Sequence, residues 1–333
     1  MDDDPFAALH AFDDSRRLTG ANRYYPLPAV VLVPRGPAAD DGAAHGRWIA
    51  LVLSLASALG WEEPLPRVHA HAAGVMLAFA APPDLLFTAT EVNEWAWERA
   101  AAAHPRQAEC GFELAHPARD DVAAHFAARA AAERSRPLAR LVAAAAWRGV
   151  PLLDDDDSVS VGEGAGSVLF ARAALPLPMD LPWPQLHAVP KVLITGSNGK
   201  TTTTRLLAAM AAAAGHVAGF CSTEGVVIGG QAVLAGDYAG PAGARAVLRH
   251  PAVTVALLET ARGGILRRGL GYRKCTVGAV LNIQSDHLGL KGVDTLEQLA
   301  AVKRVVVEIA NDTAVLNADD ACCLAMAEHT KAR

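Results

Sequence analysis

The stretch Thr195-Gly-Ser-Asn-Gly-Lys-Thr201 has the residue types and the spacing that could bind the phosphates of a nucleotide. Gly196 and Gly199 allow backbone conformations and close approaches that a side chain would prevent. The N–H groups of such a turn, and the N-terminus of a helix behind it, present partial positive charge to an anion. Lys200 adds a full positive charge for the outer phosphates, and the Thr201 hydroxyl can ligate Mg2+. We interpret this stretch as a phosphate-binding loop.

The elements around the loop favour this interpretation. A β-branched, apolar run over Val192–Ile194 predicts a buried strand, and an apolar-periodic segment from Thr201 predicts a helix. The match to the pattern G-x-x-x-x-G-K-[ST] is incomplete, because Ile194 stands where the first glycine is expected. The alternative is a chance Gly-Lys-Thr in a surface turn.

Composition limits the classes of protein to consider. The 333 residues are 52% hydrophobic and 20% charged, which suits two globular domains. A net charge of −5 argues against a general nucleic-acid surface. The apolar run Trp48–Leu59 is far shorter than the ~20 residues of a membrane span. The N-terminus lacks the basic region of a signal peptide, and five cysteines without metal-ligand spacing suit a reducing compartment. We therefore expect a cytoplasmic protein with no nucleic-acid or membrane partner.

A proline-dense stretch over 175–184 predicts a stiff linker between two domains. We expect an α+β N-terminal domain over 1–172, a linker over 173–189 and an α/β domain over 190–333. In the first domain, Thr88-Ala-Thr-Glu91 has the spacing of a capping box before a helix. Its other expected elements are strands at 29–33, 67–70 and 75–79 and helices at 44–59, 121–134 and 137–147.

Three further patterns in the first 172 residues have ordinary structural explanations that we favour. His69 and His71 alternate on a strand as metal ligands can, but no acidic or cysteine partner stands nearby in the sequence. The charge run Asp154–Asp157 is typical of a solvated loop. The glycines of 161–166 do not have the spacing G-x-G-x-x-G of a dinucleotide-binding turn.

After Pro190, strands and helices alternate, which predicts a doubly wound, mostly parallel sheet with ligands beyond the carboxyl ends of its strands. The expected strands are 192–195, 217–221, 253–259, 277–282 and 314–316, the expected helices are 201–213, 241–249 and 295–309, and a turn-rich excursion covers 223–243.

Polar clusters follow several of these strands. Glu259 ends one strand, Asn282 ends the next and is followed by Asp286-His287, and Asn317 ends the last and is followed by Asp319-Asp320. Each residue taken alone could be a helix cap or a turn residue. A carboxylate at a strand end beside a phosphate loop is nevertheless a place for Mg2+, which prefers oxygen ligands.

The segment from Lys191 to about Glu328 resembles the central ATP-binding domain of the Mur ligase family, and within it the Mur-like part of cyanophycin synthetases. A fainter resemblance joins residues 14–22 to the start of the cyanophycin synthetase N-terminal domain. The motifs that carry the main resemblance are residues 195–202, 223–225, 259–267, 269–272, 282–289 and 316–320.

This resemblance implies an ATP-dependent ligase that activates a carboxylate as an acyl phosphate and joins it to an amino acid. It implies ATP and Mg2+, and the likeness to cyanophycin synthetases suggests an aspartate-rich peptide and arginine as substrates; a homo-oligomer is a further expectation. The implied roles are catalysis by Lys200, His287, Lys303 and Arg262, nucleotide binding by Gly196, Asn198, Gly199, Lys200, Thr201 and Thr202, nucleoside proximity for Asn282 and Asn317, and metal binding by Thr201, Glu259 and His287. Lys303 matches a lysine that family members carbamylate, and the alternative is an ordinary lysine on a helix surface.

Two departures from cyanophycin synthetases leave alternatives open. The chain has only a short segment where those proteins carry an ATP-grasp domain, and it stops at Arg333, where the family continues into a C-terminal domain. A non-catalytic ATP-binding module, or a remnant that needs a partner, is therefore the alternative to a ligase. A P-loop kinase would leave Glu259 and Asp286-His287 unexplained.

Overall fold

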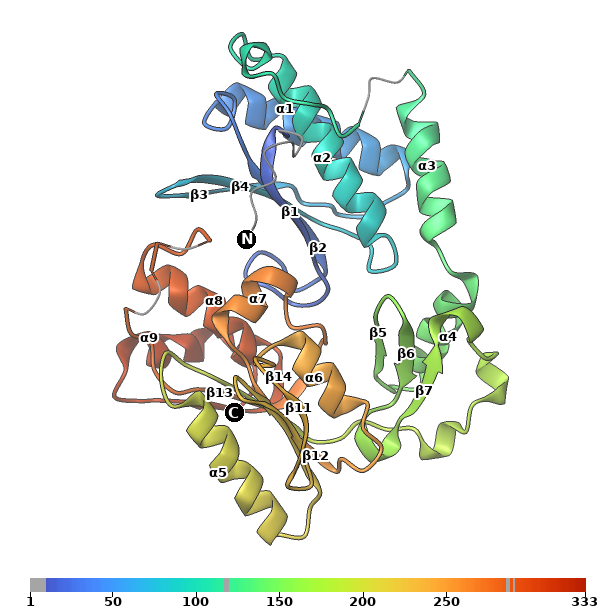
Figure 1. The fold of residues 1–333 in the computed structure, drawn as a ribbon, viewed down its shortest axis with the longest axis vertical. Helices are drawn as coiled ribbons and strands as arrows, with labels where there is room; N and C mark the ends of the chain where they lie inside the picture. Colours follow the sequence, from blue (N-terminus) through green and yellow to red (C-terminus); the bar gives the residue numbers. More distant parts are fainter. Residues whose placement is uncertain (1–9, 117–119, 286–287, 290) are drawn as a thin grey trace. The chain divides into compact units, whose positions relative to one another are not determined.

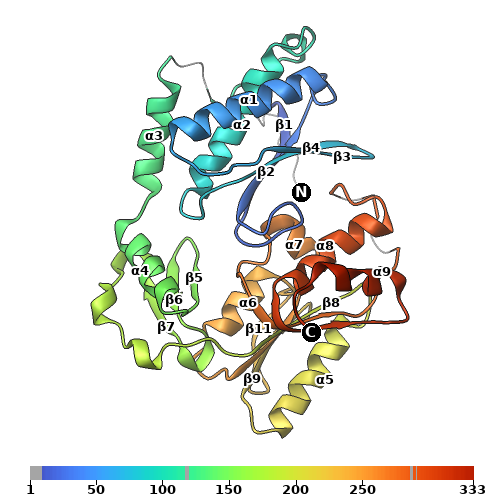
Figure 2. The same cartoon turned by 180° about the vertical axis from the view of Figure 1, so that it is seen from behind.

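The computed structural model describes residues 10–116, 120–285, 288–289 and 291–333 of the chain. The chain forms two compact units (Figures 1 and 2). Unit 1 comprises Met1–Thr19, Tyr24–Arg134 and Gly289–Asp294, and unit 2 comprises Gly20–Arg23, Ser135–Leu288 and Thr295–Arg333. The stretch expected as a linker, 173–189, lies inside unit 2, where it contains short 3-10 helices. How the chain divides into independently folding domains stays a prediction.

Unit 1 is the expected α+β fold. Its antiparallel sheet has the order β1-β2-β4-β3 (Phe12–Leu18, Ala29–Pro34, Gly74–Ala80, Arg67–His71). Helices α1 (Gly42–Ala58), α2 (Leu86–Ala102) and α3 (Val122–Glu133) accompany it. The fully buried Trp48, Phe79 and Trp97 form its core because α1, α2 and β4 bring them together. Strand β1 was not predicted, since its polar residues are extended by pairing with β2 and not by their own propensity.

The predicted capping box at Thr88 is wrong. Helix α2 already begins at Leu86, so Thr88 lies in its first turn and not before it. The N–H groups of Phe87 and Thr88 donate to the carboxylate of Glu133, at 2.8 and 2.7 Å. A side chain from α3, 45 residues away, therefore satisfies donors that a local cap would otherwise bind.

The expected solvated loop at 154–157 is also wrong for Asp155. In unit 2, α4 (Arg136–Trp147) is followed by an antiparallel sheet of β5 (Leu152–Asp154), β6 (Ser158–Val161) and β7 (Val168–Ala171). Asp155 pairs with the Arg249 guanidinium, which also donates to the carbonyl oxygens of Leu153 and Ser158. Burial raises the pKa of Asp155, but Arg249 and the backbone N–H of Ser158 outweigh this and lower it to about 2. This charge therefore joins the small sheet to the rest of unit 2.

The glycine-rich turn after β6 is a packing element of the same junction. Gly164 has φ +53°, and a Cβ there would lie 2.2 Å from the carbonyl oxygen of Val253. That approach lets the N–H of Ala165 donate to the same oxygen at 2.7 Å. Beside it, the buried carboxylate of Glu163 pairs with Lys191, the first residue of β8. The stretch is therefore structural, as its spacing indicates.

The main sheet of unit 2 has seven strands in the order β11-β10-β9-β12-β8-β13-β14. The five neighbouring strands β9, β12, β8, β13 and β14 are parallel to one another, which confirms the doubly wound, mostly parallel fold. Antiparallel β10 and β11 extend one edge, inside the stretch predicted as a turn-rich excursion. The strands are β8 (Lys191–Thr195), β9 (Ala218–Ser222), β10 (Gly225–Ile228), β11 (Gln231–Ala235), β12 (Val255–Glu259), β13 (Cys275–Val280) and β14 (Ala310–Leu316).

Helices cover both faces of this sheet. Helix α5 (Lys200–Ala213) packs on one face through Ala208, against Ile194 and Leu257. Helices α6 (Pro241–Leu248) and α8 (Leu296–Glu308) lie on the opposite face (Figure 1). Short helices α7 (Arg262–Arg268) and α9 (Ala321–Leu324) follow β12 and β14. Within the described residues, none of the helices combines the length and apolar character that crossing a bilayer requires.

Candidate functional site

The predicted phosphate loop joins the carboxyl end of β8 to the first turn of α5. Gly196 has φ +155°, and a Cβ there would lie 3.0 Å from the Cβ of Leu281. Gly199 has φ +84° and occupies the N-cap position of α5. Both glycines are therefore required by the course of the backbone. The loop leads directly to the positive end of a helix dipole, which favours an anion.

Two lysines converge on the carbonyl oxygen of Gly196. Lys200 donates to it and to the carbonyl oxygen of Ser197, both at 3.0 Å, so its side chain folds over the loop. Lys303 on α8 donates to the same Gly196 oxygen at 2.5 Å and is 3% exposed. The alternative of an ordinary surface lysine at 303 is therefore wrong, while its carbamylation stays a prediction. The pair gathers positive charge at the base of the loop.

A carboxylate faces the first turn of α5 from the end of β12. The Thr201 hydroxyl donates to Oε2 of Glu259 at 2.8 Å and lies 3.4 Å from the Thr223 hydroxyl. Glu259 is 1% exposed, and its Oε1 makes no hydrogen bond to the described residues. Burial raises the pKa of Glu259, and the Thr201 hydroxyl and the Lys200 charge oppose this shift. A buried acceptor oxygen beside a hydroxyl and a phosphate loop fits Mg2+, which prefers oxygen ligands.

Other predicted site residues have different outcomes. His287 lies outside the described residues. Arg262 begins α7 and is half-buried, and Thr202 is exposed on α5. Their expected roles stay predictions.

The segment 281–284, after β13, binds the phosphate loop. The Asn282 side chain accepts from the N–H of Asn198 (2.9 Å) and donates to its carbonyl oxygen (3.1 Å). Gln284 accepts from the Asn198 side chain at 2.7 Å. Its backbone N–H donates to the Ser197 hydroxyl at 2.9 Å. In this structure Asn282 therefore holds the loop; its expected proximity to a nucleoside stays a prediction.

Ser197, Gln284 and Asp320 stand in the predicted motifs, but no site role was predicted for them. Asn317, which was predicted, donates from its side chain to the carbonyl oxygen of Leu281 at 3.0 Å. Asp320 accepts from the N–H of Ile283 at 2.7 Å. The spacing of these residues along the chain gives no sign of such contacts, since they depend on the order β8-β13-β14 in the sheet.

Part of this chain is similar to known proteins. Residues 194–333 match the Mur ligase middle domain. A cyanophycin synthetase from Crocosphaera subtropica is 52% identical over 169 residues, which are 50% of this chain and 19% of that protein. The one from Trichormus variabilis is 51% identical over 158 residues, 46% of this chain and 18% of that protein. The UDP-N-acetylmuramoylalanine–D-glutamate ligase of Desulfitobacterium hafniense is 32% identical over 177 residues, 53% of this chain and 33% of that protein.

The resemblance predicted from the strand-end motifs is thus confirmed for the Mur ligase middle domain. The chain spans less than a fifth of the length of the cyanophycin synthetases it matches. Two solved structures are similar over a little more than two fifths of this chain. A UDP-N-acetylmuramoyl-L-alanyl-D-glutamate–2,6-diaminopimelate ligase is 24% identical over 42% of this chain and 29% of its own (TM-score 0.35). A folylpolyglutamate synthase/dihydrofolate synthase with Mn, AMPPNP and L-glutamate bound is 23% identical over 43% and 42% (TM-score 0.34).

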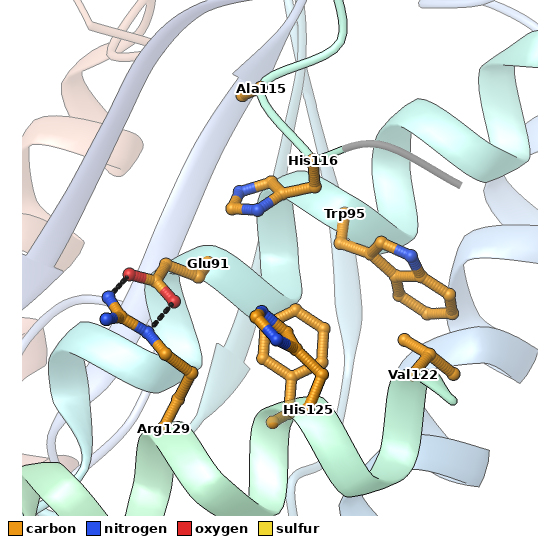
Figure 3. Close-up of a pocket in the computed structure, with 8 residues that line it drawn as sticks. Glu91, Trp95, Ala115, His116, Val122, His125 and Arg129 are labelled. Carbon is orange, nitrogen blue, oxygen red and sulfur yellow. Dashed lines mark hydrogen bonds and ion pairs between the residues drawn. The ribbon is translucent and has the colours of Figure 1, made fainter. Parts of the chain in front are cut away.

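Two hollows lie away from the phosphate loop. A groove of about 670 Å³ runs between α5 and strands β9 to β11. In unit 1, a cavity of about 250 Å³ has the Trp95 and Phe126 rings in its wall, with His116 and the Glu91–Arg129 ion pair at its rim (Figure 3). The cationic groups at that rim are already paired, since His116 contacts Glu94 at 3.1 Å.

Proposed function

We propose that unit 2 binds Mg-ATP and supports an ATP-dependent ligase reaction that joins a carboxylate to the amine of an amino acid. The observation that carries the proposal is the Thr201–Glu259 contact beside the phosphate loop, with a buried Glu259 oxygen left for a ligand. Relatives that match this part of the chain are named as synthetases and ligases. Their agreement supports the reaction class.

The residues of the chain supply positioning and charge, which are the main requirements of phosphoryl transfer. The loop N–H groups and Lys200 would bind the outer phosphates, so Lys200 must leave the two carbonyl oxygens that it now contacts. Thr201 and Glu259 would hold Mg2+. When bound, this ion neutralises phosphate charge. No protein nucleophile is required, because an oxygen of the substrate carboxylate attacks the γ-phosphorus as ADP leaves.

The second half of the proposed reaction releases phosphate. The amine attacks the acyl carbon, the C–O bond to phosphate breaks, and the amine loses a proton. Arg262, at the start of α7 after β12, is our candidate to bind a carboxylate or phosphate, since guanidinium suits planar anions. An aspartate-rich peptide and arginine are the substrates that we propose from the resemblance to cyanophycin synthetases.

A phosphate-release assay with Mg-ATP tests this function. We expect release from the chain that depends on both an acidic peptide and an amino acid, and loss of it in Lys200→Ala. Formation of ADP without phosphate release, together with a stable phosphorylated hydroxyl compound, would indicate a kinase instead. ATP binding without release for any carboxylate and amine pair would favour a non-catalytic ATP-binding module.

A further inference from the structure

The turn between β14 and α9 contacts the backbone on both sides of Asn282. The Asn317 side chain donates to the carbonyl oxygen of Leu281 at 3.0 Å. The Oδ2 atom of Asp320 accepts from the N–H of Ile283 at 2.7 Å. Asn282 is therefore flanked by two residues whose backbone groups are held by side chains that follow the last strand of the sheet.

Asp320 is itself fixed by the start of α9. Its Oδ1 atom accepts from the N–H of Cys323 at 3.0 Å, which makes it the N-cap of that helix. Burial raises the pKa of Asp320, but the N–H groups of Ile283 and Cys323 outweigh this and keep it below its ordinary value. The carboxylate thus joins two elements, one oxygen to each. A capped helix is a rigid support for the N–H of Ile283.

The held segment is the one that shapes the phosphate loop. Six hydrogen bonds join Ser197 and Asn198 to Asn282 and Gln284. Three of them use a backbone group of the loop itself, at Ser197 or Asn198, so a shift of 281–284 must move the loop backbone as well. The N–H groups of Ser197 and Asn198 donate to Asn282, so this segment fixes the backbone from which the following N–H groups would reach a phosphate.

We propose that Asp320 is a positioning residue for phosphate binding, which acts through Ile283 and Asn282 on the loop at 196–199. The proposal rests on the proposed function, because it assumes that this loop binds ATP. It assigns Asp320 no contact with the ligand. Its effect must therefore appear with any ligand that occupies the phosphate loop, whether or not that ligand carries a nucleoside.

Mg-tripolyphosphate and Mg-ATP, titrated calorimetrically into the whole chain, separate positioning from nucleoside contact. In Asp320→Asn an amide replaces one acceptor oxygen, and we expect both dissociation constants to rise by about tenfold, the factor that a lost charged hydrogen bond gives. Asp319→Asn is the matched control. It changes the net charge equally at an exposed neighbour, and we expect wild-type affinity for both ligands.

Hydrogen exchange without any ligand gives a second measurement. In Asp320→Asn we expect faster amide exchange at 281–284 and at 196–199 than in Asp319→Asn, with native circular dichroism in both. If Asp320→Asn weakens Mg-ATP but not Mg-tripolyphosphate, the residue acts on the nucleoside and the proposal is overturned. Wild-type affinity and exchange in Asp320→Asn would overturn it too. If the wild type binds neither ligand, the proposed function fails, and this proposal with it.

Discussion

Replacing Glu259 by glutamine should make the protein more stable and its metal-dependent nucleotide binding weaker. In Glu259→Gln the new amide keeps an oxygen for the Thr201 hydroxyl, which lies 2.8 Å from Oε2 in the wild type, but the side chain carries no charge. The wild-type carboxylate is 1% exposed and has one oxygen without a hydrogen bond to the described residues. At pH 7 folding must either bury the charge of this carboxylate or bind a proton, and a neutral amide avoids both costs, so we expect the free energy of unfolding at pH 7 to rise by about 1 kcal/mol.

The sign of this effect depends on pH. Burial raises the pKa of Glu259, so the folded protein binds this proton more tightly than the unfolded chain does. Wild-type stability from this group is fully present below the unfolded pKa and is lost as pH rises through the folded pKa. The stability difference between Glu259→Gln and wild type should therefore be largest at neutral pH and should shrink toward about pH 4. Urea denaturation at several pH values measures it.

Calorimetric titration with ATP, in Mg2+ and in EDTA, measures the expected loss of metal-dependent nucleotide binding. We expect Glu259→Gln to lose at least about tenfold in Mg-ATP affinity, equivalent to about 1.4 kcal/mol, with little change in EDTA. Glu224→Gln is the matched control, since its side chain is 64% exposed and surface changes rarely exceed about 0.5 kcal/mol. A Glu259→Gln protein that is less stable at pH 7 and binds Mg-ATP as wild type does would refute this account of the carboxylate.

Other predictions concern the supporting structure. Burial lowers the pKa of His116, but the Glu94 carboxylate outweighs this and raises the pKa. The stabilisation from this histidine is therefore present below about pH 6.5 and is lost as pH rises through the raised pKa. Thermal melts of wild type and His116→Gln should converge above neutral pH, and a constant difference in melting temperature would contradict this. Gly164→Ala should lower the free energy of unfolding by more than the backbone strain of about 1–3 kcal/mol, because its Cβ would lie 2.2 Å from a carbonyl oxygen. Gly230→Ala, where a Cβ meets open space, should cost only the strain. Equal denaturation midpoints for the two variants would argue against the contact at Gly164. Arg249→Ala, which breaks an ion pair with 12% of the arginine side chain exposed, should lower the free energy of unfolding by about 3 kcal/mol, and a change under about 1 kcal/mol would mean that the small sheet is held by other contacts.

Local patterns were enough to predict the phosphate loop and its flanking elements. The apolar run before Thr195 and the periodic segment after Lys200 each determine their own structure, and β8 and α5 have nearly the predicted bounds. The hairpin β10–β11 was missed although a Gly229-Gly230 turn between two largely apolar runs is a recognised hairpin signal. That error came from giving the glycines too much weight as loop residues.

Contacts between distant segments could not be predicted in the same way. Glu133 caps α2 and Asp155 pairs with Arg249 because tertiary folding brings them together, and neither pair has a fixed spacing. The same holds for Asp320 and Ile283. Strand-end residues could be expected near one another from the parallel sheet, but which side chain holds which backbone group depends on strand order and register.

The most direct test of the central claim is a calorimetric titration of the whole chain with Mg-ATP, beside Lys200→Ala. We predict micromolar binding by the wild type and loss of at least about tenfold in the variant, since a point charge on the outer phosphates is removed. Equal affinity in the two proteins, or no binding by the wild type, would contradict the assignment of 195–201 as an ATP-binding loop.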